Sequence, residues 1–328
     1  MSSNDAKISL VGSIALGTGV MIGAGIFALV GQVAGLAGPW FPLAFTAGAV
    51  VASTSSHVYA RYSSVNPSAG GIAMLLKDAY GPRAIAGTFS MFMYVSMVIA
   101  ESLLARTFGT YLLTPFEMQD SRVLVAILGV ILVVIATLVN LVGNRAVEAS
   151  ALITAALKII GIAVLAIAGL IATTLTNGWA SLLEGNHPAQ PLEAIGSVAL
   201  CLLAYKGFTT ITNQGEDLRH PERNIARSIY LSIVICAVLY LLLNIAVSAS
   251  IGWDGAAEAR DYALAEAARP IFGHWGVTLT VVIAIIATVS GLLASLYSVS
   301  RLYAMLQEMH QAPRLPASIP HQPLLVTA

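Results

Sequence analysis

Charge is what this sequence has least of. Asp, Glu, Lys and Arg make up 10% of the 328 residues, whereas hydrophobic residues make up 57%. A soluble domain carries about 25% charged residues. The deficit excludes an ordinary soluble domain and predicts a chain that crosses a lipid bilayer several times. The formal net charge is zero, so the chain has no excess of positive charge with which to bind nucleic acid.

Cysteines and catalytic motifs are also scarce. The two cysteines, Cys201 and Cys236, both lie in apolar runs, and their spacing supports neither a disulfide framework nor a metal site. The sequence contains no HExxH motif, no nucleophile elbow and no paired catalytic carboxylates. We therefore predict no enzyme activity and no cofactor. An intramembrane enzyme is a competing hypothesis, which a hydrolysis screen of the purified protein would test.

Long apolar runs dominate what is present. About 20 apolar residues suffice for a helix to cross the ~30 Å hydrocarbon layer. The first run is too long for a cleavable signal-peptide core, so we expect it in the mature protein. Two amphipathic stretches, Gly71–Tyr80 and Arg260–Pro270, are expected at the membrane surface. The predicted fold class is an all-α polytopic membrane protein with eight spans, at 8–36, 41–63, 84–113, 122–142, 146–173, 191–215, 224–251 and 275–307.

Basic residues are divided unevenly between the two sides of this topology. With the N-terminus inside the cell, ten face the cytoplasm and three face the opposite side. The positive-inside rule then favours a cytoplasmic N-terminus, and we predict a location in the plasma (inner) membrane. Glu216, Asp217 and Glu222 lie among arginines, a pattern typical of a solvated salt-bridge cluster. The ten cytoplasmic basic residues are Lys7, Arg61, Lys77, Arg83, Arg145, Arg219, Arg223, Arg227, Arg301 and Arg314.

A lysine lies deep within the fifth apolar run. Lys158 is about 12 residues from the start of that run at Ala146, hence ~18 Å deep at 1.5 Å per residue. This depth is near the centre of the bilayer, where an ammonium group is costly and by default indicates function. A structural lysine that pairs with a carboxylate on another helix is the alternative interpretation.

The first run is rich in glycine at its centre. Gly17, Gly19, Gly23 and Gly25 fall within nine residues, and glycine is unfavourable in helix interiors. The spacing of Gly19 and Gly23 also fits a close-packed pair of helices, but this explanation does not account for Gly25. We therefore predict that this membrane helix is interrupted.

The sixth run has a similar irregularity at Lys206 and Gly207, after which the residues become polar. Non-helical backbone is tolerated at membrane depth only where it is buried in protein or lines a cavity. Interrupted helices at corresponding positions of two repeats indicate a transporter site, and the first and sixth runs are five apart. Free N–H groups at such breaks suit a carboxylate and free carbonyls suit an ammonium. The predicted site therefore fits a zwitterion such as an amino acid.

Two motifs carry a family resemblance. GVMIGAGIF at Gly19–Phe27 and LLAYKGFTTITNQGEDLRHPERNIARSI at Leu202–Ile229 resemble the amino acid–polyamine–organocation (APC) superfamily of transporters. GNRAVEASALITAALK, which ends at Lys158, and DYALAEAARPIFG at Asp261–Gly273 are similar to its proton-coupled, sodium-independent amino acid transporters. The resemblance runs from about residue 8 to the C-terminus.

The resemblance implies a fold of twelve helices with a five-plus-five inverted repeat. Residues 1–7 would be a cytoplasmic N-terminus, 8–173 helices 1–5 and 174–308 helices 6–8. Residues 309–328 resemble the cytoplasmic link to a ninth helix, so the second repeat is expected to be truncated. Helices 1, 2, 6 and 7 are expected to move against a framework of helices 3, 4 and 8.

Seven residues are implied to surround the substrate. Backbone N–H groups would bind its carboxylate, carbonyl groups would bind its amino group, and one aromatic ring would help to occlude the site. They are Gly23, Ala24 and Gly25 for the carboxylate, Leu203, Ala204 and Lys206 for the amino group, and Phe208 for the ring.

Four residues are implied in proton coupling. Lys158 resembles the lysine whose ammonium group replaces a sodium ion between helices 1, 5 and 8. Its expected first contact is the Gly19 carbonyl. Thr288 and Ser290 are the candidates on the eighth run, although Ala287 is a possible occupant of a position where relatives keep a hydroxyl.

Two further charges lie within membrane runs. Glu101 in the third run and Lys206 in the sixth form a possible charge pair, because intramembrane charges usually pair. Arg106 is not on the same helix face as Glu101 and is expected to extend toward the outer surface. A paired Lys206 would favour substrates with neutral side chains.

The predicted function is secondary active transport of amino acids, coupled to protons through the buried lysine. The predicted partners are the amino acid, protons and the lipid bilayer, and the sequence fixes neither the oligomeric state nor which amino acids are carried. A non-transporting membrane sensor or assembly subunit derived from such a permease is the competing hypothesis. Binding of amino acids without uptake would favour it.

Overall fold

The computed structural model describes residues 7–68, 71–81, 83–142, 145–175, 190–313 and 322–327. Within these ranges the chain is helical, and the only sheet-like pairing is an isolated parallel bridge between Ile8 and Leu218. The helices are α1 (Leu10–Ala24), α2 (Ile26–Ala37), η1 (Gly38–Trp40), α3 (Phe41–Val65), α4 (Gly71–Tyr80), α5 (Ala84–Leu113), η2 (Thr114–Phe116), α6 (Arg122–Val142), α7 (Arg145–Leu175), α8 (Pro191–Tyr205), α9 (Phe208–Thr212), η4 (Gly215–Asp217), α10 (Pro221–Ala259), η5 (Arg260–Tyr262), α11 (Ala263–Glu308) and α12 (Gln322–Thr327).

The described residues contain six helical segments that are long and apolar enough to cross a membrane. A shorter apolar helix covers Leu10–Gly23. The predicted fold class, an all-α polytopic membrane protein, is confirmed. The six segments are Ile26–Val65, Ala84–Phe116, Arg122–Leu141, Leu152–Leu175, Pro191–Thr212 and Pro221–Glu308.

One of these segments holds two predicted spans. Pro221–Glu308 contains the predicted seventh and eighth spans, because α10 and α11 continue through sharp turns at Gly252 (φ 71°) and Gly273 (φ 59°). Glycine adopts such positive φ angles readily, so the chain turns there without a long loop. Gly71–Tyr80 forms α4 as predicted, whereas the second amphipathic stretch is divided between η5 and the start of α11.

The helix α6 shows which side of the bundle faces lipid. Val123, Ile127, Val130, Val134 and Leu138 recur every three or four residues and are all exposed. Such a stripe is unfavourable in water, but lipid tails are as apolar as these side chains. This face of α6 is therefore suited to the hydrocarbon layer.

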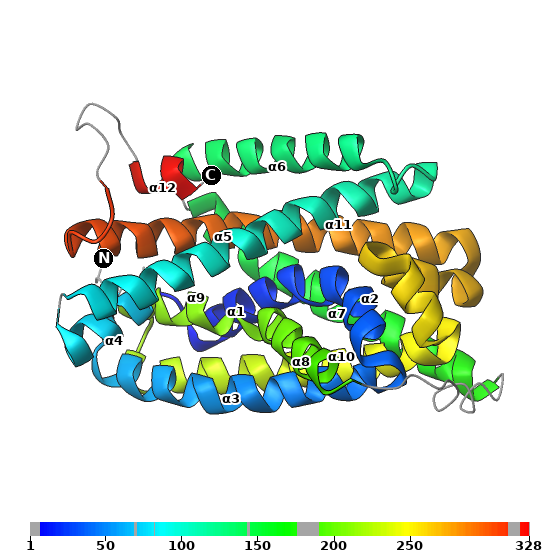
Figure 1. Ribbon diagram of the computed structural model, residues 1–328, viewed down its shortest axis with the longest axis horizontal. Coiled ribbons are helices and arrows are strands. Elements are labelled where there is room, and N and C mark those ends of the chain that lie inside the picture. Colours follow the sequence, from blue (N-terminus) through cyan, green and yellow to red (C-terminus); the bar gives the residue numbers. More distant parts are fainter. Residues whose placement is uncertain are drawn as a thin grey trace.

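The glycine-rich helix α1 lies at the centre of the bundle. Figure 1 shows α1, α8 and α9 between α3 on one side and α5 with α11 on the other. Residues 15–23 of α1 are buried throughout, against α7, α10 and α11. A helix enclosed on every side has no need of a polar face, which explains why α1 is apolar all round.

Candidate functional site

The first membrane helix is interrupted at the last of its four central glycines. Helix α1 ends at Ala24, α2 begins at Ile26, and Gly25 between them has φ −92° and ψ −66°. The Gly25 N–H donates to the Met21 carbonyl at 2.9 Å, and the Leu29 N–H donates to the Gly25 carbonyl at 3.1 Å. The interruption is therefore a kink that keeps part of its hydrogen bonding, and the Gly25 N–H is already used within the helix.

The sixth membrane helix is interrupted at Lys206 and Gly207, between α8 and α9. The Lys206 N–H donates to the Leu203 carbonyl at 3.3 Å, and the Lys206 carbonyl accepts from the Thr209 N–H at 3.1 Å. These bonds join residues three apart, as in a tight 3₁₀ turn. The Ala204 carbonyl accepts from the Tyr240 hydroxyl at 3.4 Å. The Lys206 carbonyl also accepts from the Thr209 hydroxyl at 2.9 Å, so it already has two protein donors. The Leu203 and Ala204 carbonyls have one donor each among the bonds given above, and a second lone pair remains on each.

The two interruptions touch through their backbones. A Cβ atom placed on Gly25 would lie 2.6 Å from the Ala204 Cα. A Cβ atom on Gly207 would lie 2.7 Å from the Met21 backbone nitrogen and 2.8 Å from the Gly17 carbonyl oxygen. All three distances are too short for a side chain, so glycine at these positions permits direct contact between the two broken helices.

Gly23 has a different neighbour, the helix α11. A Cβ atom at Gly23 would lie 2.6 Å from the Ala287 carbonyl oxygen and 3.0 Å from the Gly291 Cα. The residue therefore marks the crossing of α1 over α11. Ala24, the third residue predicted to bind a carboxylate, is the last residue of α1.

Phe208 lies at the start of α9, directly after the second interruption. Its side chain is buried, and its ring meets Tyr59 of α3 edge to face, with 5.4 Å between the ring centroids. The predicted occluding ring is therefore packed between the interruption and α3.

Lys158 reaches the centre of the bundle from α7. Its side chain is 1% exposed, and its Nζ donates a hydrogen bond to the Gly19 carbonyl oxygen at 2.7 Å. The predicted contact between these residues is present. None of the ion pairs among the described residues involves Lys158, so the alternative of a carboxylate partner finds no support there. The Cys236 thiol of α10 lies near enough to interact with Lys158 electrostatically.

No hydrogen bond among the described residues joins Thr288 or Ser290 to Lys158. The Thr288 hydroxyl donates to the Ala284 carbonyl at 2.8 Å, and the Ser290 hydroxyl donates to the Ile286 carbonyl at 2.5 Å. Both hydroxyls thus satisfy the backbone of their own helix, one turn earlier. Of the four residues predicted to take part in proton coupling, Lys158 and Gly19 are joined directly by a hydrogen bond.

The predicted direct pair between Glu101 and Lys206 is not formed. Instead, the Lys206 Nζ donates to the Ser96 hydroxyl at 2.7 Å, and the Ser295 hydroxyl donates to Glu101 Oε1 at 2.9 Å. No ion pair between the two charged residues occurs in the described part of the chain. Hydroxyl groups on α5 and α11 lie closer to each charge than the charges lie to each other.

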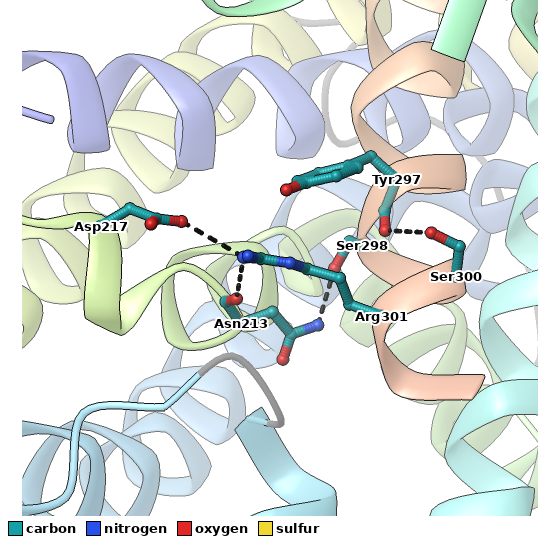
Figure 2. A network of polar contacts seen from close by, with 6 residues as sticks. All are labelled: Asn213, Asp217, Tyr297, Ser298, Ser300 and Arg301. Carbon is teal, nitrogen blue, oxygen red and sulfur yellow. Dashed lines mark hydrogen bonds and ion pairs between the residues drawn. The ribbon is translucent and has the colours of Figure 1, made fainter. Parts of the chain in front are cut away.

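The end of the bundle at which the chain begins, here called the Ile8 end, is held by contacts that the sequence did not indicate. Figure 2 shows Arg301 of α11 beside η4: it donates to Asp217 Oδ2 at 3.2 Å and to the Asn213 carbonyl at 3.0 Å. The Asn213 side chain donates to the Ser298 hydroxyl at 2.7 Å. Within the predicted solvated cluster, Asp217 therefore pairs with Arg301, a residue far along the chain, and its side chain stays 46% exposed.

Backbone hydrogen bonds close the same end. The Ile8 N–H donates to the Asp217 carbonyl at 2.7 Å, and the Arg219 N–H donates to the Ile8 carbonyl at 2.9 Å. The segment before α1 is therefore fixed to the connection between α9 and α10.

The opposite end, here called the Asp261 end, has its own ion pair. Arg106 Nε of α5 lies 2.9 Å from Asp261 Oδ2 of η5, and the Gln32 side-chain amide of α2 donates to Asp261 Oδ1 at 3.0 Å. Arg106 extends to the surface as predicted, but toward a partner. A cavity of about 940 Å³ between α5, α6 and η5 lies at this end, and none of the predicted site residues lines it.

An apolar bundle with two buried helices interrupted at contacting positions, and an ammonium group enclosed beside one of them, defines an integral membrane protein of the transporter class. The model of the amino acid permease family matches residues 8–317. The chain belongs to the amino acid permease family, and it is a membrane transport protein.

Individual relatives agree with this assignment. The chain is 28% identical to the inner membrane transport protein YbaT of Escherichia coli over 319 residues, which cover 96% of this chain and 72% of the relative. It is 28% identical to an uncharacterised protein of Methanocaldococcus jannaschii, over 90% of this chain and 67% of the relative. It is also 27% identical to the vacuolar cationic amino acid transporter 4 of Arabidopsis thaliana, over 74% of this chain and 42% of that protein.

Proposed function

We propose that this permease carries amino acids and couples their movement to protons through Lys158. The observation that carries the proposal is the hydrogen bond from the enclosed Lys158 ammonium group to the Gly19 carbonyl of α1. The Lys158 ammonium group thus links α7 to the central helix α1 without a carboxylate partner among the described residues. A charge enclosed in this way is costly and is retained where it has a function.

Proton transfer at Lys158 provides a physical link between the cation and the position of α1. With the proton bound, the ammonium group holds α1 at Gly19 by a charge-assisted hydrogen bond. When the proton leaves, the charge disappears and the bond weakens, so α1 is released to move relative to α7. A protein with a built-in, titratable cation does not require sodium at this place.

The substrate site lies where the two interruptions meet. A zwitterion there would take the place of the backbone contact between Gly25 and Ala204, with its carboxylate near Gly23–Gly25 and its amino group near the carbonyls of Leu203, Ala204 and Lys206. We place the Ile8 end in the cytoplasm, on the basis of the ten basic residues on that side, and the protein in the plasma (inner) membrane.

Uptake into proteoliposomes tests this proposal. Labelled amino acids should accumulate when the outside is more acidic than the inside, and equally well with sodium or with choline in the buffer. Lys158→Ala should lower gradient-driven uptake by about tenfold or more and flatten its dependence on pH, whereas Lys77→Ala on the surface helix α4 is the matched control. A strict requirement for sodium, or an unchanged pH profile in Lys158→Ala, would reject the role of this lysine.

A sensor or assembly subunit with the same fold is the second candidate. It is favoured if the purified chain binds amino acids in equilibrium dialysis but no panel member accumulates in proteoliposomes under any gradient. Uptake by the same preparation rejects it.

A further inference from the structure

Two opposite charges lie in the middle of this membrane protein, each bound to a hydroxyl group. Lys206, half-buried at the interruption between α8 and α9, donates to Ser96 at 2.7 Å. Glu101 on α5 is 4% exposed and accepts from Ser295 of α11 at 2.9 Å. Charges at this depth are costly, and one neutral hydroxyl each does not compensate them.

Both charges border the proposed substrate site. A Cβ atom at Gly291 would lie 3.2 Å from the Gly23 Cα and 3.7 Å from Leu104 Cδ2, so α1, α5 and α11 meet there. Glu101 precedes Leu104 by one helical turn, and Ser295 follows Gly291 by one turn, about 5.4 Å along each helix. The Glu101–Ser295 contact is therefore one turn from the α1 crossing, and Lys206 belongs to the other interruption.

The two groups keep most of their hydrogen-bonding capacity. An ammonium group has three N–H donors and a carboxylate has about four acceptor positions, and the hydrogen bonds given above use one of each. The two groups interact electrostatically without forming a direct ion pair, and each remains able to contact a third group. The side chain of the substrate would be that third group.

We propose that Lys206 and Glu101 together restrict the substrate to amino acids with uncharged side chains. A charged side chain would be attracted by one of the two groups and repelled by the other, so it would gain little net attraction to offset the loss of its water. A neutral polar side chain could accept from Lys206 or donate to Glu101 without that loss. Like charges in a poorly hydrated site repel more strongly than in water. The inference rests on the proposed amino acid transport, and it separates this chain from the Arabidopsis relative that is named a cationic amino acid transporter.

The test removes one charge at a time and measures relative affinity. Unlabelled neutral, acidic and basic amino acids compete for binding of a labelled neutral amino acid to the purified full chain. Glu101→Gln leaves Lys206 uncompensated, so competition by aspartate and glutamate should strengthen by about tenfold relative to neutral amino acids. Lys206→Met leaves Glu101 uncompensated, so lysine and arginine should gain by a similar factor.

The opposite directions of the two shifts are the decisive readout, because a merely structural role would weaken all competitors alike. The double variant should return most of the way to the neutral preference, as a coupled pair requires. Glu258→Gln, an exposed carboxylate at the Asp261 end, and Lys77→Met are matched controls that should leave the preference unchanged. If one of the charge-removing variants does not fold, the other alone decides by the direction of its shift.

Failure of this inference differs from failure of the proposed function. A wild-type chain that binds neutral amino acids, with single variants that keep the same preference or shift in the same direction, overturns the charge restriction but leaves amino acid binding in place. A wild-type chain that prefers lysine or arginine overturns the restriction as well. A chain that binds no amino acid overturns both.

Discussion

The two ends of the bundle are closed by ion pairs of different kinds. At the Asp261 end the carboxylate side chain is 8% exposed, and both of its oxygens are bound, by Arg106 and Gln32. At the Ile8 end the Asp217 side chain is 46% exposed, and its Oδ2 pairs with Arg301, whose side chain is 26% exposed. The first carboxylate has given up its water, whereas the second still has access to it.

This difference decides what each ion pair is worth. Breaking a buried pair leaves a charge without compensation and costs about 3–5 kcal/mol, whereas an exposed pair contributes about 0–1 kcal/mol. The Asp261 pair lies between these limits, because its carboxylate is buried but Arg106 is 64% exposed. The Asp261 end is therefore held by side-chain electrostatics, and the Ile8 end mainly by the backbone bonds of Ile8 with Asp217 and Arg219. A transporter must open both ends in turn, and we expect the Ile8 end to open at the lower electrostatic cost.

The largest effect is expected from Arg106→Ala. Asp261 would keep Gln32 but lose its cation, which should lower the free energy of unfolding by about 2 kcal/mol, less than for a fully buried pair because Arg106 itself is exposed. Thermal unfolding in detergent measures the loss, and hydrogen exchange of the η5 amides should rise with it. Arg122→Ala, at the same end and without an ion pair among those described, should change neither.

A smaller effect is expected from Arg301→Ala. Water can replace the guanidinium group at the exposed Asp217 carboxylate, so the loss should be about 1 kcal/mol and should shrink as salt screens the pair. The same unfolding assay at low and high salt measures it, with the exposed Arg227→Ala as the control. A loss as large as that of Arg106→Ala would show that the solvent exposure of the carboxylate does not determine how much each ion pair stabilises its end of the bundle.

The smallest expected effect is the interaction free energy between the ion pairs at the two ends of the bundle. In Arg106→Ala combined with Arg301→Ala, the two losses should add to within about 0.5 kcal/mol, because distant sites without shared partners are independent. A double-mutant cycle on the unfolding free energies gives this value. Clear non-additivity would instead mean that opening one end already alters the other in the resting protein.

Local features of this molecule were predictable from its sequence. Apolar length gave the membrane helices, because a helix in lipid must cover its own backbone polar groups and expose apolar side chains. Glycine content indicated the interruption at Gly25, and a lysine beside a glycine indicated the one at Lys206. The family resemblance supplied the contact of Lys158 with Gly19, which is present, although its role in coupling remains a prediction.

Pairings between residues far apart in the sequence were harder to predict. The direct Glu101–Lys206 pair was wrong because Ser96 and Ser295 lie closer to the charges, and no periodicity reveals which hydroxyl on which helix will turn inward. The partners of Asp217 and Asp261 lie on helices far away in the sequence, and their choice depends on how the bundle packs. The roles of Thr288 and Ser290 remain predictions, since their hydroxyls donate to carbonyls one turn earlier, as hydroxyls in a helix commonly do.

The backbone contact between Gly25 and Ala204 has a mechanical consequence. Side chains absorb small displacements by changing rotamer, but a contact made by main-chain atoms has no rotamer to change. A displacement of one interrupted helix is therefore transmitted directly to the other, because no side chain between them can absorb it. In the proposed transport cycle, a substrate that enters between the two helices would displace both at once, so that filling the proposed site and starting the rearrangement of the bundle would be a single step.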